Sequence, residues 1–116
     1  MRSIENDVMQ FALDFAANMK WDIPEIIRIK INRMERCLGW CIPDTQSDGV
    51  YILLSEKTCK SNHQFFATLI HELIHAVLVN SKHWKKSHKH GRCFQKLAKQ
   101  VEKKTNGFFT VKEIME

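Results

Sequence analysis

Residues 61–80 read SNHQFFATLIHELIHAVLVN, and this stretch decides the fold of the chain. Its apolar residues recur at steps of three and four, which is the period of an α-helix. They form one stripe and a second row that widens it: Phe66, Ile70, Leu73 and Val77, then Leu69, Ile74 and Leu78. We therefore expect a helix that is buried on most of its circumference and packs against several other elements.

The residues before this helix predict one further helix and three strands. Apolar residues at helical spacing follow Ser3, an N-cap residue type, and predict a helix over residues 4–20. After Pro24 the apolar period changes to two, which is typical of half-buried strands. The three alternating sets are Ile27, Ile29 and Ile31; Leu38, Trp40 and Ile42; and Val50, Ile52 and Leu54. We interpret them as a small three-stranded antiparallel sheet.

The residues after the buried helix predict a polar, basic loop and one last helix. The loop covers about 80–89, and apolar spacing marks the helix at Phe94, Leu97, Ala98 and Val101. Gly107 is suited to the C-cap of that helix, and the tail with Phe108 and Phe109 should pack back on the core. The order of helix, three strands and two helices predicts a single α+β domain over residues 1–116.

The composition is that of one ordinary globular domain. The chain has 116 residues, of which 44% are hydrophobic and 27% charged, and this excludes disordered and fibrous classes. No run approaches the ~20 apolar residues of a membrane span, and residues 1–7 lack the apolar core of a signal peptide. We expect a monomeric cytoplasmic protein without membrane contact, whose cysteines are free thiols: Cys37, Cys41, Cys59 and Cys93.

The pentapeptide His71-Glu72-Leu73-Ile74-His75 places two imidazoles one turn apart on the buried helix. Residues four apart are about 5–6 Å apart at Cβ, so both rings can reach one metal ion. A catalytic zinc site uses three protein ligands and keeps a water. Glu72 points about 100° round the helix, where its carboxylate can act on that water as a general base. Two structural core histidines are the alternative interpretation, but they leave the Glu72 carboxylate in an apolar stretch.

A third metal ligand has to come from outside the pentapeptide. A histidine six residues beyond His75 would indicate a metzincin, but position 81 is Ser. Glu102 lies among lysines inside the last helix, and we do not expect it to bind a metal. The remaining histidines are His83, His88 and His90. His90 stands at the start of the last helix, whose packing would hold it, whereas the other two lie in the polar loop.

Three features together resemble the catalytic domain of the SprT-like zinc metalloproteases. They are His71-Glu72-Leu73-Ile74-His75-Ala76, the fifteen-residue step from His75 to His90, and His90-Gly91-x-x-Phe94. The resemblance covers about 21–104 and implies a zincin-like metallopeptidase domain with one zinc ion, bound by His71, His75 and His90, and with Glu72 as the catalytic residue. It implies a protein substrate, and the DNA-dependent branch of the family degrades proteins crosslinked to DNA. Unlike many relatives, the chain has no Cys-x-x-Cys zinc ribbon after this core.

Basic residues concentrate in 82–104. This segment has nine Lys or Arg residues against one acidic residue, in a chain of formal net charge +5. The candidates for contacts with nucleic-acid phosphates are Lys82, Lys85, Lys86, Lys89 and Arg92, and Trp84 is a candidate for stacking on a base. We expect DNA as a partner of this segment, and a solvated lysine-rich face is the alternative interpretation.

Two other functions fit parts of the pattern. Glu35-Arg36-Cys37-Leu38 is faintly similar to the cysteine-ligand segment of peptide deformylases, but Arg36 stands where that family has Gly. A non-catalytic, zinc-stabilised nucleic-acid-binding module would use the same histidines and basic segment, yet nothing in it requires Glu72. For an enzyme, the group that stabilises the oxyanion stays open among Tyr51, His83, His88, Arg92 and the zinc ion itself.

Overall fold

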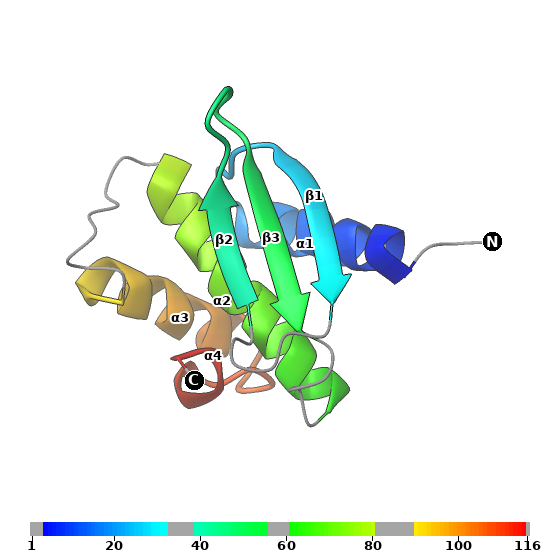
Figure 1. Cartoon of the computed structure of the whole chain (residues 1–116). Helices are drawn as coiled ribbons and strands as arrows, with labels where there is room; N and C mark the ends of the chain where they lie inside the picture. Colours follow the sequence, from blue (N-terminus) through cyan, green and yellow to red (C-terminus); the bar gives the residue numbers. More distant parts are fainter. Residues whose placement is uncertain (1–3, 33–38, 56–60, 81–89, 116) are drawn as a thin grey trace.

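The computed structural model describes residues 4–32, 39–55, 61–80 and 90–115. The elements run in the order α1 (Ile4–Met19), β1 (Ile26–Asn32), β2 (Gly39–Pro43), β3 (Val50–Ser55), α2 (Asn62–Asn80), α3 (Arg92–Lys104) and α4 (Val111–Met115), as Figure 1 shows. The predicted α+β class is confirmed. Among the helices of these ranges, not one has both the length and the apolar character that crossing a membrane requires.

The sheet is mixed, so the predicted purely antiparallel sheet is wrong. Its strand order is β1-β3-β2, with β3 parallel to β1 and antiparallel to β2. In the central strand Val50, Ile52 and Leu54 are each 0% exposed. The most apolar strand takes the middle position because paired neighbours shield both of its edges. β1 and β2, although consecutive in the sequence, therefore lie at opposite edges of the sheet (Figure 1).

The apolar pattern of β2 predicts that Trp40 and Ile42 face the helices. In the structure the opposite face of the strand is turned towards the helices. Cys41 stands opposite Ile52 and packs against the core, so Trp40 and Ile42 face outward. These two side chains are 50% and 39% exposed. The small residues of the strand, Gly39 and Cys41, are therefore the ones that approach the helices.

Strand β1 departs from simple alternation at its start. A register shift between Ile26 and Arg28 places Ile26 in the core and leaves Ile27 36% exposed. The bulge adds one residue to β1 without adding one to β3. The side chains before the bulge therefore point to the face opposite to the one that strict alternation along β1 would give them. Ile29 remains buried, as the sequence pattern predicts.

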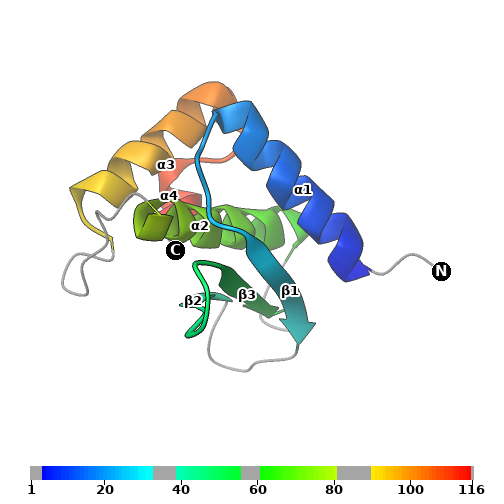
Figure 2. The same cartoon turned by 90° about the horizontal axis from the view of Figure 1, so that it is seen from above.

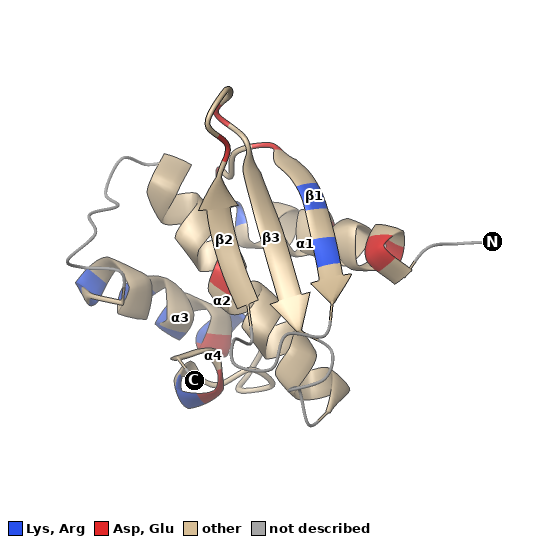
Figure 3. Ribbon diagram, in the orientation of Figure 1, with Lys and Arg blue, Asp and Glu red and all other residues tan. Residues whose placement is uncertain are grey.

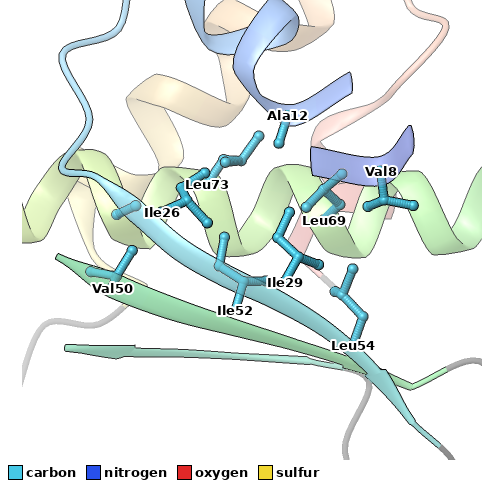
Figure 4. Packing of buried hydrophobic residues seen from close by; sticks show 10 residues of the cluster. Val8, Ala12, Ile26, Ile29, Val50, Ile52, Leu54, Leu69 and Leu73 are labelled. Atoms are coloured by element: carbon cyan, nitrogen blue, oxygen red, sulfur yellow. The ribbon is translucent and has the colours of Figure 1, made fainter. Parts of the chain in front are cut away.

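Helix α2 lies between two packed regions, which Figure 2 shows from above. On one side α1 and the sheet enclose a core that includes Leu69 and Leu73 of α2 (Figure 4). On the other side α3 and α4 enclose a second core that includes Ile70 and Ile74. The expectation of a helix buried on most of its circumference is confirmed, and both cores meet on this one element.

The end of the described chain folds back on the second core. After α3, Asn106 and Gly107 have φ values of 53° and 79°, and this left-handed turn reverses the chain. Phe109 is 6% exposed and Ile114 of α4 is 0% exposed, so this part of the tail packs on the core as predicted, whereas Phe108 is 65% exposed and does not. Helix α4 itself was not predicted.

Candidate metal centre

Three imidazoles meet at one point beside α2. His71 and His75 lie one turn apart on α2, and His90 lies two residues before α3. The Nε2 atom of His75 is 3.2 Å from that of His71 and 3.2 Å from that of His90, and the third separation is 3.1 Å. Ligands of a tetrahedral zinc ion at about 2.0–2.1 Å are roughly 3.3 Å apart. The triangle of nitrogens therefore fits one such ion, and these three residues can hold a metal.

The His71 ring is oriented by a backbone group of α4. Its Nδ1 lies 2.6 Å from the carbonyl oxygen of Ile114, so the Nδ1–H donates to that carbonyl and leaves the Nε2 lone pair directed at the other two histidines. Burial lowers the pKa of His71, and the bond to Ile114 partly offsets this shift. The neutral imidazole, which is the form that binds a metal, is therefore favoured.

Helix α4 is held in place by side chains around its first turn. The Glu113 carboxylate accepts bonds from the backbone N–H and the hydroxyl of Thr110, at 2.9 and 3.0 Å. Its other oxygen lies 2.8 Å from Nε2 of His63, on α2. The N–H of Val111 donates to Glu102 at 3.0 Å. These contacts fix the position of the Ile114 carbonyl relative to α2.

One aromatic ring packs beneath the three histidines. Phe94 is 0% exposed, and its ring centroid lies 4.7, 4.9 and 5.0 Å from those of His71, His75 and His90. Because Phe94 belongs to the first turn of α3, its packing holds that helix start, and with it His90, against α2. This is the arrangement that the spacing between His90 and Phe94 predicts.

Glu72 faces the sheet and is 4% exposed. Its carboxylate accepts a hydrogen bond from the backbone N–H of Cys41 in β2. A Cβ atom at Gly39 would stand 3.1 Å from Oε2 of Glu72, so a larger residue would require this carboxylate or its neighbours to move by a few tenths of an ångström. The outward rotation of Trp40 and Ile42 follows from this close approach, because the helix side of β2 has no room for large side chains.

Burial dominates the electrostatics of Glu72. Desolvation raises the pKa of its carboxyl to about 8, and the N–H of Cys41 partly opposes the shift. The neighbouring Cys41 thiol has its pKa raised to about 12, first by burial and then by the Glu72 charge. A carboxylate with a pKa near neutrality can both accept and return a proton.

The histidines and Glu72 open into one pocket of about 300 Å³. It is bounded by β2 on one side and by α2 and the start of α3 on the other. Its lining residues are Gly39, Trp40, Cys41, Pro43, His71, Glu72, His75, Val79 and His90. A substrate that enters this pocket meets the three nitrogens and the carboxylate together.

Other predicted site residues have different locations. Arg92 lies exposed on α3, and Tyr51 belongs to the sheet, outside the pocket. The Glu102 carboxylate accepts a hydrogen bond from the Val111 N–H, and Glu102 does not belong to the group of three histidines. The remaining candidates lie outside the described residues: Lys82, His83, Trp84, Lys85, Lys86, His88 and Lys89, together with Cys37 and Cys59. Of the cysteines that the structure describes, Cys41 and Cys93 are free thiols.

Sequence reasoning missed the backbone contributions to the centre. The Cys41 N–H and the Ile114 carbonyl have no residue-type signature, since every residue carries these groups except for the N–H of proline. Helix α4 does have a signal: Thr110-x-x-Glu113 is a capping box, which marks the start of a helix.

Comparison with known proteins finds one matching family. A model of the SprT-like family matches residues 8–113, nearly the whole chain. No curated protein matches it.

Proposed function

Because the chain belongs to the SprT-like family, we propose that it is a zinc metallopeptidase that hydrolyses peptide bonds in proteins. The observation that carries the proposal is the shared pocket, in which three converging imidazole nitrogens and the Glu72 carboxylate lie together. His71, His75 and His90 would hold one zinc ion. A zinc ion bound there would polarise the substrate carbonyl and lower the pKa of water.

Glu72 supplies the proton chemistry in this proposal. Its carboxylate accepts a proton from the attacking water, and the resulting acid then donates that proton to the leaving amine nitrogen. The Cys41 N–H orients the carboxylate throughout, and burial raises the pKa of Glu72 above its ordinary value, which makes the carboxylate a stronger base. A purely structural zinc site has no use for a buried carboxylate beside an open pocket.

The test compares wild type with Glu72→Gln, and with Glu25→Gln as a matched control on an exposed residue. Each zinc-loaded protein is incubated with a DNA-binding protein as substrate, with and without single-stranded DNA. We expect both variants to keep about one zinc per chain, and only Glu72→Gln to lose cleavage. Equal cleavage by wild type and Glu72→Gln would contradict the role of Glu72. Zinc and DNA binding without any cleavage by wild type would favour the nucleic-acid-binding module instead.

We further propose that residues 82–104 bring the enzyme to DNA-associated proteins. Figure 3 marks basic positions in blue along the α3 ribbon. Within the described part of this segment, four basic side chains lie exposed along one face of α3, with Gln95 and Gln100 beside them. They are Arg92, Lys96, Lys99 and Lys103. Cations spaced along one helix face in this way can contact successive phosphates of a nucleic-acid backbone.

The nucleic-acid proposal is tested with the triple variant Lys96→Gln/Lys99→Gln/Lys103→Gln. If these lysines contact phosphates, the salt dependence of binding to single-stranded DNA should flatten by roughly 0.7 per lost contact. Any stimulation of cleavage by DNA should fall, while cleavage without DNA is kept. An unchanged salt slope would show that the α3 face is simply solvated.

A further inference from the structure

The outer face of the sheet carries two ordered rows of side chains. The register places Arg28, Tyr51 and Ile42 in one row across β1, β3 and β2. It places Lys30, Leu53 and Trp40 in the next row. Each row thus begins with a cation on β1 and ends with a large apolar side chain on β2.

This face is not part of either core. The helices pack on the opposite side of the sheet, and among the described elements none lies over the outer face (Figures 1 and 2). Trp40 and Ile42 remain 50% and 39% exposed, and a hollow follows the β1 and β3 side chains towards Ile42. Large apolar side chains grouped in this way on a surface indicate a binding site.

The outer face is continuous with the metal pocket through strand β2. Trp40 stands at the end of one row and also lines the pocket that contains the histidines. Pro43, which follows Ile42, lines the same pocket. A chain that leaves the pocket over β2 therefore reaches the two rows directly.

The exposed face of α3 and the outer face of the sheet differ in chemistry. The α3 face carries four cations and two amides, which suits a phosphate backbone. The sheet face carries four apolar or aromatic side chains, with its two cations confined to β1. Apolar and aromatic side chains at the centre with charges at the rim are typical of a surface that binds protein.

We propose that the outer face of the sheet is a docking surface for the polypeptide substrate. It binds an apolar segment of the substrate across β2 and β3, with acidic side chains of the substrate directed to Arg28 and Lys30. This proposal rests on the proposed peptidase function and names the substrate class: extended, apolar polypeptide with flanking acidic residues. Binding of a long substrate then gains a contact outside the pocket that a short peptide cannot make.

The kinetic test uses Ile42→Thr/Lys30→Gln, which changes one side chain in each row and none that lines the pocket. The control Ile4→Thr/Lys104→Gln makes the same chemical changes at exposed positions on α1 and α3. Casein, an extended acidic protein, is compared with a short neutral peptide that fills only the pocket. We expect the KM for casein to rise about tenfold with kcat within twofold, and the short-peptide kinetics to stay unchanged. Equal KM values for casein in the two double variants would overturn the proposal.

A binding measurement separates this proposal from the peptidase function itself. Zinc-loaded Glu72→Gln protein, with and without Ile42→Thr/Lys30→Gln, is titrated with casein, and thermal melts confirm folding. Loss of binding in the combined variant supports the docking surface even if wild type cleaves nothing. Unchanged casein binding would overturn the proposal. If the combined variant then loses binding of an oligothymidylate, the face would be assigned to nucleic acid, and if it loses self-association, to a second copy of the chain.

Discussion

The two sides of α2 support different parts of the candidate centre. On the sheet side, β2 contacts Glu72 through the Cys41 N–H and the space at Gly39. On the other side, His90 stands two residues before α3, and α4 orients His71 through the Ile114 carbonyl. The part of the molecule that would bind the metal is thus separate from the part that would position the proton-transfer group. Substitutions on the two sides should therefore change different measurable quantities.

The largest effect is expected from His90→Ala, on the α3 side. It removes one of three nitrogens that lie 3.1–3.2 Å apart. Loss of an outer-shell partner alone costs about 10–100-fold in metal affinity, so loss of a ligand should cost more than about a hundredfold. Zinc content after dialysis and competition with a chelator measure the change. If the variant keeps one zinc at wild-type affinity, His90 is not a ligand.

On the sheet side, Gly39→Ala should reduce turnover and spare the metal. The new Cβ would meet Oε2 of Glu72, the carbonyl oxygen of Leu53 and Cγ2 of Thr68, each at 3.1 Å. A displacement of a few tenths of an ångström at Glu72 should lower kcat about tenfold, with unchanged zinc affinity.

The matched control for Gly39→Ala is Gly49→Ala. Its Cβ would be crowded by Ile27 at 2.8 Å, and neither residue lines the pocket. The control should lose stability without losing turnover per folded molecule. A similar loss of kcat in both variants would mean that the effect is general strain in the sheet and not a displacement of Glu72.

Glu113→Gln tests the α4 side, and its effect on zinc affinity should be smaller than that of His90→Ala. It removes the ion pair with His63 but leaves the Ile114 carbonyl in place, so zinc affinity should fall only about threefold, below the range for losing the partner itself. Stability should fall by about 0.5 kcal/mol or less, because both side chains are about one third exposed. Zinc titration and thermal melts measure the two effects. Normal kcat at saturating zinc is expected, and a lowered kcat would place Glu113 in the chemistry.

Glu5→Gln should have the smallest effect and touch neither side of the centre. Glu5 accepts the Ile31 N–H at 3.0 Å and lies 3.4 Å from Arg28. The hydrogen bond from the Ile31 N–H is the main cause that lowers the pKa of Glu5 below its ordinary value of 4.5. The ionised Glu5 carboxylate therefore stabilises the fold at pH values above 4.5, and this contribution is lost when the pH falls below that value. We expect a loss of about 0.5 kcal/mol at neutral pH that disappears in acid. A difference between wild type and variant that grows in acid would refute this assignment.

Local patterns in the sequence predicted helices α1, α2 and α3 and strand β3 well, but not helix α4. The 3.6-residue period of α2 and the alternation of Val50, Ile52 and Leu54 reflect burial of single elements, which does not depend on knowing their partners. Strand order does depend on partners. The antiparallel prediction was wrong because β3 lies between the other two strands and runs parallel to β1. The predicted face of β2 was wrong because the small residues of this strand pack against Glu72.

The candidate centre divides in the same way. His71, Glu72 and His75 follow from spacing within one helix, and the structure adds His90 to them at the position that the family resemblance implied. The groups that orient them, the Cys41 N–H and the Ile114 carbonyl, come from distant backbone. Their roles are set by tertiary packing, which no local pattern encodes.

The Ile114 carbonyl also has a consequence for the order in which the protein is made. Translation delivers β2 and α2 before α4, and a domain generally folds as a unit. Two histidines of α2 are therefore synthesised early, but His71 gains its orienting partner only after residue 114 has emerged and docked. A nascent chain thus cannot complete this site, and the finished centre appears only with the fully packed domain.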